Sequence, residues 1–385
     1  MPTDLLPFDG TVRACVPDGT WQALVPRLPH YGITRVADLT GLDYLCLPVC
    51  MAHRPNAHTL TASQGKGATH RLAAISAVME AIELWHAEQP APVDTHAPAY
   101  AVPLDYPLDA LPLRIPPTGL PELAALTRIP QDWTMGTGLT TGRSLLAPTR
   151  VISRDAQPMW APALWRSTST GLACGNTHDE AVAHALFEVI ERHALYVDEK
   201  GGGTLRTLID PATVDDTYAR SLIDRIHHSG ATLELFIVDN TFGMPVCLAY
   251  LWSEDYPVYF AGSGCHLDAS IALSRAITEA AQSRLTNIAG TRDDLPSHAD
   301  FFASPQPTPE PLRQPMAPWR TQLKNYPALT AATFADLVRT VATRLEKTAG
   351  FEPIAVTLSD PDAPLVAVKV VAPGARSRTR RDIPR

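Results

Sequence analysis

The chain has 385 residues, of which 45% are hydrophobic and 19% charged, so it is a globular protein with enough length for a sizeable core. Its net charge of −8 argues against a nucleic-acid partner. The N-terminus lacks the basic and apolar regions of a signal peptide, and no apolar run reaches the roughly 20 residues of a membrane span. Because the six cysteines form no CxxC pair, we expect a cytoplasmic protein without membrane contact, disulfide scaffold or thiolate metal site.

Hydrophobic periodicity along the chain predicts a mixture of helices and strands, which indicates an α/β or α+β fold. Helices are expected at 69–88, 178–199, 217–228, 268–289 and 333–348. Strands are expected at 233–240, 244–252, 256–262, 353–360 and 364–373. Two proline-rich stretches, at about 90–130 and 304–319, are expected to be extended connectors because proline breaks helices and restricts the residue before it.

Three of the expected helices share the spacing A-x3-A-x2-E-x2-E/Q, and each follows a glycine-containing turn. The turns are SQGKG (63–67), TGLACGN (170–176) and GSG (262–264). Residues at these offsets fall on one side of a helix, so each helix has an alanine stripe that ends in a polar pair. Small alanines allow close packing, and the three polar pairs are then expected to converge. The repeated residues are Ala73, Ala77, Glu80 and Glu83; Ala181, Ala185, Glu188 and Glu191; and Ala272, Ala276, Glu279 and Gln282.

The repeated polar pairs predict a magnesium and nucleotide site. A single E-x2-E is usually a solvated helix face, but its recurrence in line with three apolar stripes disfavours that interpretation. Inward-facing carboxylates need cations, since unpaired buried charge is costly. Oxygen ligands of this kind suit Mg²⁺, which in turn points to nucleotide phosphates. Lys66, Arg192 and Arg284 lie close by in the sequence and are interpreted as cations that face phosphate oxygens.

At these segments the chain resembles the YcaO family of ATP-dependent peptide-modifying enzymes. The matching stretches are SQGKGATHRLAAISAVMEAIE, STSTGLACGNTHDEAVAHALFEVIER and GSGCHLDASIALSRAITEAAQSRLTNIAGTRDD. The resemblance implies an α/β fold of pseudo-repeated sheet-and-helix units around an ATP site. It also divides the chain into an N-terminal segment, 1–58, and a YcaO domain, 59–385.

The resemblance also implies roles for individual residues. The magnesium ligands would be Glu80, Glu83, Glu188, Glu191 and Glu279. The nucleotide contacts would be Ser63, Lys66, Gly67, Ser76, Thr170, Gln282 and Arg284, with Lys66, Arg192 and Arg284 acting in catalysis. The chain departs from the usual family pattern at Thr170, where asparagine is common, and at His193, where aspartate is common. His70, His193 and His266 lie near the motifs, but the sequence does not identify the general base.

The reaction implied by the resemblance is the ATP-dependent activation of a backbone amide in a ribosomally made precursor peptide, in natural-product and antibiotic biosynthesis. Sulfide, a cysteine thiol or an amine adds to the amide, and phosphorylation then makes the amide oxygen a good leaving group. The opening at 31–60 is similar to stand-alone members that work with a TfuA-type partner. This favours a thioamide synthetase that uses an external sulfur donor.

Other interpretations stay open from the sequence. They are an azoline- or macroamidine-forming cyclodehydratase, a non-catalytic ATP-binding protein that presents peptide to a partner, and an ATP-dependent ligase of another family. A homodimer is also left open. Residues 375–385 contain five arginines and lack the Pro-x-Pro-x-Pro tail of azoline-forming relatives. We expect this tail to be mobile and dispensable for catalysis, because so polar a segment packs poorly.

Overall fold

The structure, a computed structural model, describes residues 4–114, 119–153, 164–292, 294–295, 298, 301–302, 309–326, 331–378 and 383–385. Its strands are β1 (Leu6–Phe8), β2 (Thr11–Arg13), β3 (Arg35–Asp38), β4 (Val49–His53), β5 (Ala62–Lys66), β6 (Thr95–Pro98), β7 (Pro130–Gly138), β8 (Ser144–Pro148), β9 (Leu172–Gly175), β10 (Arg206–Ile209), β11 (Thr232–Val238), β12 (Val246–Ser253), β13 (Tyr256–Cys265), β14 (Ile354–Thr357) and β15 (Val366–Val371). Its helices are α1 (Pro17–Leu24), α2 (His70–Glu88), α3 (Leu120–Leu126), α4 (Thr149–Ile152), α5 (His178–Lys200), α6 (Thr217–His228), α7 (Ala269–Ala289), α9 (Trp319–Leu323) and α10 (Phe334–Ala349).

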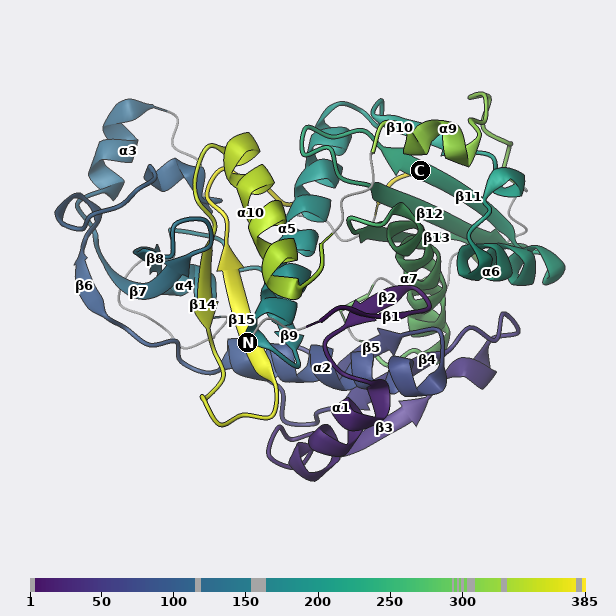
Figure 1. The fold of residues 1–385 in the computed structure, drawn as a ribbon, viewed down its shortest axis with the longest axis horizontal. Helices are drawn as coiled ribbons and strands as arrows, with labels where there is room; N and C mark the ends of the chain where they lie inside the picture. The colour runs from purple at the N-terminus through teal and green to yellow at the C-terminus, as the bar shows by residue number, and fades with distance from the viewer. Residues whose placement is uncertain are drawn as a thin grey trace.

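The strands form separate antiparallel sheets with helices between and around them (Figure 1). A six-stranded sheet has the order β6-β7-β14-β15-β9, with β8 paired to β7, and a four-stranded sheet has the order β10-β11-β12-β13. Helix α5 lies between these two sheets, and α10 packs beside it (Figure 1). Helices α6 and α7 cover the other face of the four-stranded sheet. A smaller sheet, β3-β4-β5, packs on α2, and β1 and β2 form a separate hairpin.

Three strand–helix units, β5–α2, β9–α5 and β13–α7, are the structural form of the repeat in the sequence. Each helix begins at a side-chain cap. Thr69 accepts a hydrogen bond from the backbone N–H of Leu72, and Thr177 accepts one from that of Glu180. Asp268 does the same for the third helix through the N–H of Ser270. Each cap satisfies a backbone donor that the first turn leaves free, so all three helices start at a fixed residue.

Glycine in each strand lets the following helix approach the strand backbone closely. A Cβ atom on Gly65 would lie 2.0 Å from the backbone nitrogen of Ala77. A Cβ atom on Gly262 would lie 2.2 Å from the carbonyl oxygen of Ala276. Gly175 faces Ala181 in the same way, at 2.5 Å. The expected alanine stripes are therefore confirmed as packing surfaces, and what they pack against is the glycine backbone of their own unit.

The five expected helices and five expected strands are confirmed, with ends that differ by a few residues. The sheet that holds β3, β4 and β5 was not expected, and neither was the β1–β2 hairpin. These strands are short and mix polar with apolar residues, so they carry little alternation to detect. No helix in the described part of the chain is long and apolar enough to cross a membrane.

The proline-rich stretch at 90–130 is more structured than expected. It contains β6 and α3 and reaches the first residue of β7. The indole nitrogen of Trp133, a fully buried residue of β7, donates to the carbonyl oxygen of Ala97 in β6 at 2.8 Å. Tertiary packing thus turns part of an expected connector into sheet. In the second stretch, residues 304–308 lie outside the described residues, and Ala317 forms a bridge with Ile209.

The expected division at residue 58 is not a structural boundary. Strand β4 precedes it and β5 follows it, and the two pair in register from Val49 with Lys66 to His53 with Ala62. The N-terminal segment therefore completes the sheet of the first unit and belongs to the same body.

The tail that the sequence predicted to be mobile is bound to the protein where the structure describes it. The Nε atom of Arg378 lies 2.7 Å from a carboxylate oxygen of Glu199, and Arg385 forms two hydrogen bonds to Glu234. Residues 379–382 lie outside the described part. Arg378 and Arg385 pair with carboxylates on α5 and β11, which composition alone does not reveal.

Gly262→Ala tests the close strand–helix approach. The added methyl group would overlap the backbone of α7, so we expect a loss of about 3 kcal/mol in the free energy of unfolding, measured by urea denaturation. The matched control is Gly41→Ala, since a Cβ atom at this exposed position meets no atom within 4 Å. We expect the control to change stability by less than about 0.5 kcal/mol. Equal stabilities for the two variants would contradict this packing.

Candidate active site

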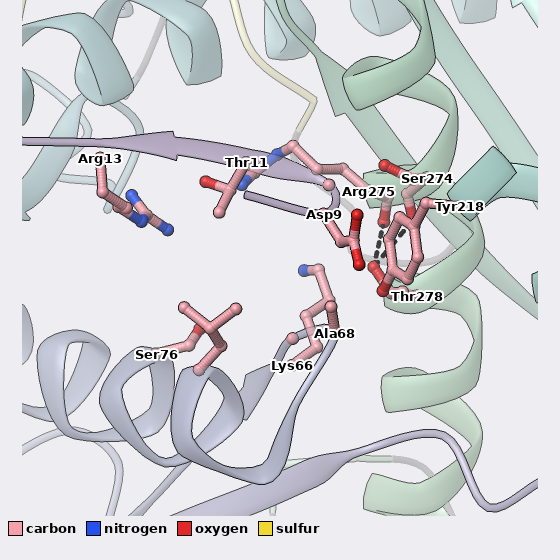
Figure 2. Close-up of a pocket in the computed structure, with 13 residues that line it drawn as sticks. Asp9, Thr11, Arg13, Lys66, Ala68, Ser76, Tyr218, Ser274, Arg275 and Thr278 are labelled. Atoms are coloured by element: carbon pink, nitrogen blue, oxygen red, sulfur yellow. Dashed lines mark hydrogen bonds between the residues drawn. The ribbon is translucent and has the colours of Figure 1, made fainter. Parts of the chain in front are cut away.

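A cavity lies between the β1–β2 hairpin, the start of α2 and the start of α7 (Figure 2). Including its open mouth, the space measures about 500 Å³. Three cationic side chains line it: Arg13, Lys66 and Arg275. The other lining residues are mostly polar or glycine, namely Asp9, Gly10, Thr11, Gly67, Ala68, Leu72, Ser76, Tyr218, Ser274 and Thr278. Cations, hydroxyls and glycine backbone in one space suit an anionic, phosphate-bearing ligand.

Lys66 joins this cavity to the repeated carboxylates. It is the last residue of β5, and its Nζ atom lies 2.9 Å from Glu279 of α7. Ser76 and Gly67, two of the predicted nucleotide contacts, line the cavity. Ser63 does not line it. Side chains alternate along a strand, so Ser63 shares the face of Gly65, which packs on α2, whereas Lys66 points the other way.

The second residue of each polar pair binds a strand of the next unit. In α2, Glu83 accepts a hydrogen bond from the backbone N–H of Cys174 in β9, at 2.8 Å. In α5, Glu191 accepts one from the hydroxyl of Ser263 in β13, at 2.6 Å. In α7, the amide nitrogen of Gln282 donates to the carbonyl oxygen of Gln64 in β5, at 2.9 Å. These three hydrogen bonds therefore link the first unit to the second, the second to the third and the third back to the first, in a closed cycle.

The cycle explains why the third motif ends in glutamine. Glu83 and Glu191 meet donors, so a carboxylate suits both positions. Gln282 meets a backbone carbonyl, which needs a donor that an ionised carboxylate cannot supply. Its other atom, the amide oxygen Oε1, is buried and has no hydrogen-bond partner. An unmet buried acceptor next to Glu279 is a free ligand for a cation.

The first residues of the three pairs lie close enough for the charges of Glu188 and Glu279 to act on Glu80. Burial, together with the charges of Glu279 and Glu188, raises the pKa of Glu80 to about 7, although Arg292 and Lys66 oppose this shift. Burial also raises the pKa values of Glu83 and Glu188. Burial alone would raise the pKa of Glu279 as well, but Lys66 and Arg192 outweigh it and lower that pKa. Mutual repulsion of this kind is relieved when a cation binds.

Arg192 lies beside the carboxylates of its own helix. Its Nε atom is 3.6 Å from Glu188 and 4.0 Å from Glu191, and these charges raise the pKa of the guanidinium in spite of burial. The side chain is 37% exposed, so part of it is free to meet a ligand. Arg192 thus lies beside Glu188 and Glu191, two of the predicted metal ligands.

The backbone of Thr170 lies near the carboxylates. The buried ammonium group of Lys369 donates to the carbonyl oxygens of Thr168 and Thr170, at 2.6 and 2.8 Å. The neighbouring Gly171 has a φ of 79° and donates its N–H to Glu188 at 3.1 Å. Thr170 is not among the residues that line the cavity. Lys369 lowers the pKa of Glu188 and is a cation that the sequence did not single out.

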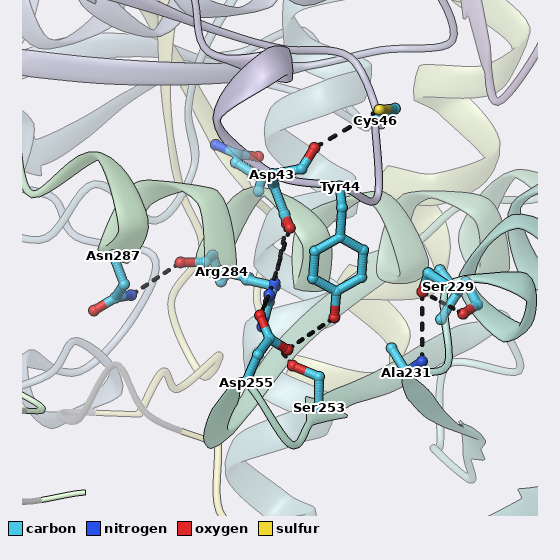
Figure 3. Close-up of polar contacts among 12 residues, drawn as sticks. Asp43, Tyr44, Cys46, Ser229, Ala231, Ser253, Asp255, Arg284 and Asn287 are labelled. Atoms are coloured by element: carbon cyan, nitrogen blue, oxygen red, sulfur yellow. Dashed lines mark hydrogen bonds and ion pairs between the residues drawn. The ribbon is translucent and has the colours of Figure 1, made fainter. Parts of the chain in front are cut away.

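Arg284, which the sequence predicted to face phosphate, does not line this cavity and instead lies among acidic side chains (Figure 3). It is 1% exposed, and its guanidinium pairs with Asp43 at 3.0 Å and with Asp255 at 2.9 Å. It also donates to the hydroxyl of Ser253 at 2.7 Å and stacks on Tyr44. Arg284 follows Gln282 by two residues, so its side chain leaves the helix on another side. It ties α7 to the loop before β4 and to the β12–β13 turn.

None of the three histidines that the sequence considered as a base lines the cavity. His70 is exposed and pairs with Asp38 at 2.9 Å. Burial lowers the pKa of His266 to about 3, and its Nδ1 accepts from the N–H of Asp268. His193 accepts through Nδ1 from the backbone N–H of Arg376. His184, which the sequence analysis passed over, contacts Arg13 at the cavity wall.

Sequence reasoning missed most of the cavity wall opposite Lys66. Asp9, Thr11 and Arg13 come from a hairpin that no pattern predicted. Arg13 is held by α5, with NH1 at 3.7 Å from the fully buried Glu180. Arg275 had a signal, because it precedes Glu279 by four residues and so shares its helix face. For Arg13 the sequence offers none, since the contact depends on the folded hairpin.

The charges of the five repeated glutamates favour a bound divalent cation. In the described part of the chain, no three His, Cys, Asp or Glu side chains are arranged as a finished metal site. The carboxylates are instead bound one by one to protein donors, at Cys174, Gly171, Ser263 and Lys66. Two cations, Lys66 and Arg192, form ion pairs with this group of five glutamates. The excess negative charge and the unmet oxygen of Gln282 both call for Mg²⁺.

Comparison with known proteins finds relatives that match nearly all of this chain and most of their own length. The chain is 38% identical over 386 residues to an uncharacterised protein of Mycobacterium tuberculosis, covering 97% of this chain and 84% of that protein. It is 35% identical over 391 residues to an uncharacterised protein encoded in the tfuA 3′ region of Rhizobium leguminosarum bv. trifolii, covering 94% and 88%.

The fold matches a solved structure of the same architecture. YcaO from Methanopyrus kandleri, determined with AMPPCP and Mg²⁺, aligns with a TM-score of 0.71 at 21% identity, over 97% of this chain and 95% of that one. A family model described as a YcaO cyclodehydratase that binds ATP and Mg²⁺ matches residues 64–376. The mixed α/β fold and the match over most of the sequence agree, and the chain belongs to the YcaO family.

Proposed function

We propose that this chain binds ATP and Mg²⁺ between its three repeated helices and uses them to activate a backbone amide in a ribosomally made precursor peptide. The product we propose is a thioamide, formed with an external sulfur donor and a TfuA-like partner. The observation that carries the proposal is the convergence of one carboxylate from each repeat, Glu80, Glu188 and Glu279, beside a cavity lined by three cations.

In this proposal the cationic side chains bind phosphate and the carboxylates bind Mg²⁺. Arg13, Lys66 and Arg275 line the cavity and are placed to hold phosphate oxygens. Glu80, Glu188 and Glu279, with Glu83, Glu191 and the oxygen of Gln282 behind them, would hold Mg²⁺. When bound, Mg²⁺ neutralises charge on the phosphoryl group during its transfer. Arg192, next to these ligands, stabilises the same charge.

The chemistry follows from the poor leaving ability of an amide oxygen. A sulfur nucleophile adds to the amide carbon and leaves the oxygen as an anion. That oxygen attacks the γ-phosphate of ATP, and ADP departs. The phosphorylated oxygen then leaves as orthophosphate while sulfur gives up its proton to solvent, so that a carbon–sulfur double bond forms. Preorganised cations stabilise the two anionic stages without reorganisation of solvent.

Two observations support the thioamide and TfuA part of the proposal. One relative is named for the tfuA 3′ region, and it covers 94% of this chain. The six cysteines are free thiols, and four of them are buried, so sulfur for transfer has to come from outside. The second candidate function is ring closure to an azoline or amidine, which the description of the family model as a cyclodehydratase favours.

Gln282→Glu tests the closed cycle. At pH 8 the new carboxylate would face the carbonyl oxygen of Gln64, so we expect a loss of about 1–3 kcal/mol in unfolding free energy, measured in urea. At pH 5 a protonated carboxyl donates to that carbonyl, and the loss should shrink. The control Glu83→Gln keeps an acceptor for Cys174 and should stay within about 1 kcal/mol of the unsubstituted chain. A Gln282→Glu variant as stable as the unsubstituted chain at pH 8 would refute the cycle.

The raised pKa of Glu80, at about 7, predicts that metal binding weakens in acid. The proton competes with Mg²⁺ for this carboxylate, so protonation below pH 7 opposes binding. We expect calorimetry with AMPPCP to show Mg²⁺ affinity falling about tenfold between pH 8 and pH 6. In Glu80→Gln the affinity should be weaker at pH 8 and lose this part of its pH dependence. Since the nucleotide titrates equally in both titrations, an identical pH dependence would contradict the assignment.

Mass spectrometry of the precursor peptide separates the two candidate functions. With ATP, Mg²⁺, sulfide and a TfuA-like partner, we expect a product heavier by the difference between sulfur and oxygen, with ADP and orthophosphate released. Loss of one water from the peptide, without sulfide and without the partner, would instead establish ring closure. ATP cleavage to AMP and pyrophosphate would overturn both and indicate a ligase.

A further inference from the structure

The end of the chain forms a strap, defined as residues 374–378 and 383–385, that runs from the six-stranded sheet to the four-stranded sheet. It begins after β15, where Gly374 adopts a φ of 84° and donates its N–H to the carbonyl oxygen of Ala110 at 2.8 Å. A Cβ atom on Gly374 would lie 2.1 Å from the carbonyl oxygen of Ala349 in α10. The next residue, Ala375, is part of the core around α5. The start of the strap is therefore fixed in one conformation.

The strap then binds the half of α5 that follows the carboxylates. The backbone N–H of Arg376 donates to Nδ1 of His193 at 2.9 Å. His193 is the residue after Arg192, and its ring packs edge-on against Phe242. Arg378 pairs with Glu199 at 2.7 Å and is 6% exposed. Its partner Glu199 is 36% exposed, so the pair is half-buried, with the guanidinium on the protected side.

The far end of the strap binds the four-stranded sheet. The carbonyl oxygen of Pro384 accepts from Arg206 at 2.7 Å and from the hydroxyl of Tyr250 at 2.8 Å. Arg385 forms two hydrogen bonds with Glu234, at 2.5 and 2.7 Å. Its guanidinium also lies 4.8 Å from the ring centre of Tyr259. These contacts reach β10, β11, β12 and β13, so the strap touches every strand of that sheet.

We propose that the strap is a clamp that sets the position of α5 against the four-stranded sheet. Helix α5 supplies Glu188, Glu191 and Arg192, and β13 supplies Ser263, to which Glu191 is bound. The strap grips α5 at His193 and Glu199 and grips the sheet at Tyr250 and Glu234. Arg378 and Arg385 are thus positioning residues that act through α5 on the metal ligands. This inference rests on the proposed function of those ligands.

The clamp reverses the sequence-based expectation that residues 375–385 are dispensable. The strap residues lie outside the cavity, since none of them is in its lining. A strap that merely stabilised the fold would change the midpoint of unfolding. A clamp changes, in addition, the Mg²⁺ concentration that half-saturates the folded protein.

Charge reversal on both sides of the Arg378–Glu199 pair gives the test. We expect Arg378→Glu and Glu199→Arg each to weaken Mg²⁺ binding with AMPPCP about tenfold at a temperature where both are folded, and the double variant to recover to within about threefold. The same pattern is expected for Arg385→Glu, Glu234→Arg and their combination. Arg313→Glu, at an arginine that is 95% exposed, is the control for the change in charge and should leave binding unaltered.

The outcomes separate the clamp from the function on which it rests. If the unsubstituted chain bound no Mg²⁺ with nucleotide, the proposed function would fail, and the clamp with it. If the unsubstituted chain bound normally and the single variants lost thermal stability alone, the clamp would fail and the proposed function would stand. Weaker Mg²⁺ binding in the single variants, without recovery in the doubles, would also overturn it.

Discussion

The closed cycle of hydrogen bonds between neighbouring units is the interaction on which the site depends. Each of the three bonds joins a helix of one unit to a strand of the next, through Glu83, Glu191 and Gln282. The cycle can close because glycine backbone in the strands lets the alanine-striped helices lie close to their own units. A larger residue at either surface would move a helix outward and open the gap between a side chain and its partner. Packing therefore determines the geometry of the polar site.

Closing the cycle has an electrostatic cost that the ligand is able to relieve. The first carboxylate of each pair is brought toward the same place, and the pKa of Glu80 rises to about 7 as a result of burial and its acidic neighbours. Groups held in an unfavourable charge state destabilise the free protein and favour a ligand that neutralises them. Lys66 and Arg192 remove part of the repulsion. The repulsion that remains among the carboxylates favours the binding of a divalent cation beside the cationic cavity.

The sequence predicted what is periodic and local. The alanine–glutamate repeat located three helices, and the caps at Thr69, Thr177 and Asp268 agree with where they begin. The same repeat predicted that Glu80, Glu188 and Glu279 lie near one another, and the charges of Glu188 and Glu279 do act on Glu80. It could not place Arg284, because a position two residues beyond Gln282 gives no sign of the buried carboxylate of Asp43 that pairs with it.

Contacts between distant segments are the part that the sequence could not supply. Arg13 reaches the cavity from a hairpin of two three-residue strands, and its partner Glu180 is far away in the chain. The tail likewise looked mobile from composition, yet Arg378 and Arg385 meet Glu199 and Glu234. In both cases a charged residue is fixed by a partner that becomes its neighbour only on folding. Local propensity carries no information about such pairs.

A crystal structure with AMPPCP and Mn²⁺ in place of Mg²⁺ is the most direct test of the account. Anomalous scattering locates Mn²⁺ without any assumption about its ligands. The account predicts Mn²⁺ bound by carboxylates of α2, α5 and α7 together, with the nucleotide phosphates against Arg13, Lys66 and Arg275. Mn²⁺ held by carboxylates of a single helix, or found away from all three, would contradict it.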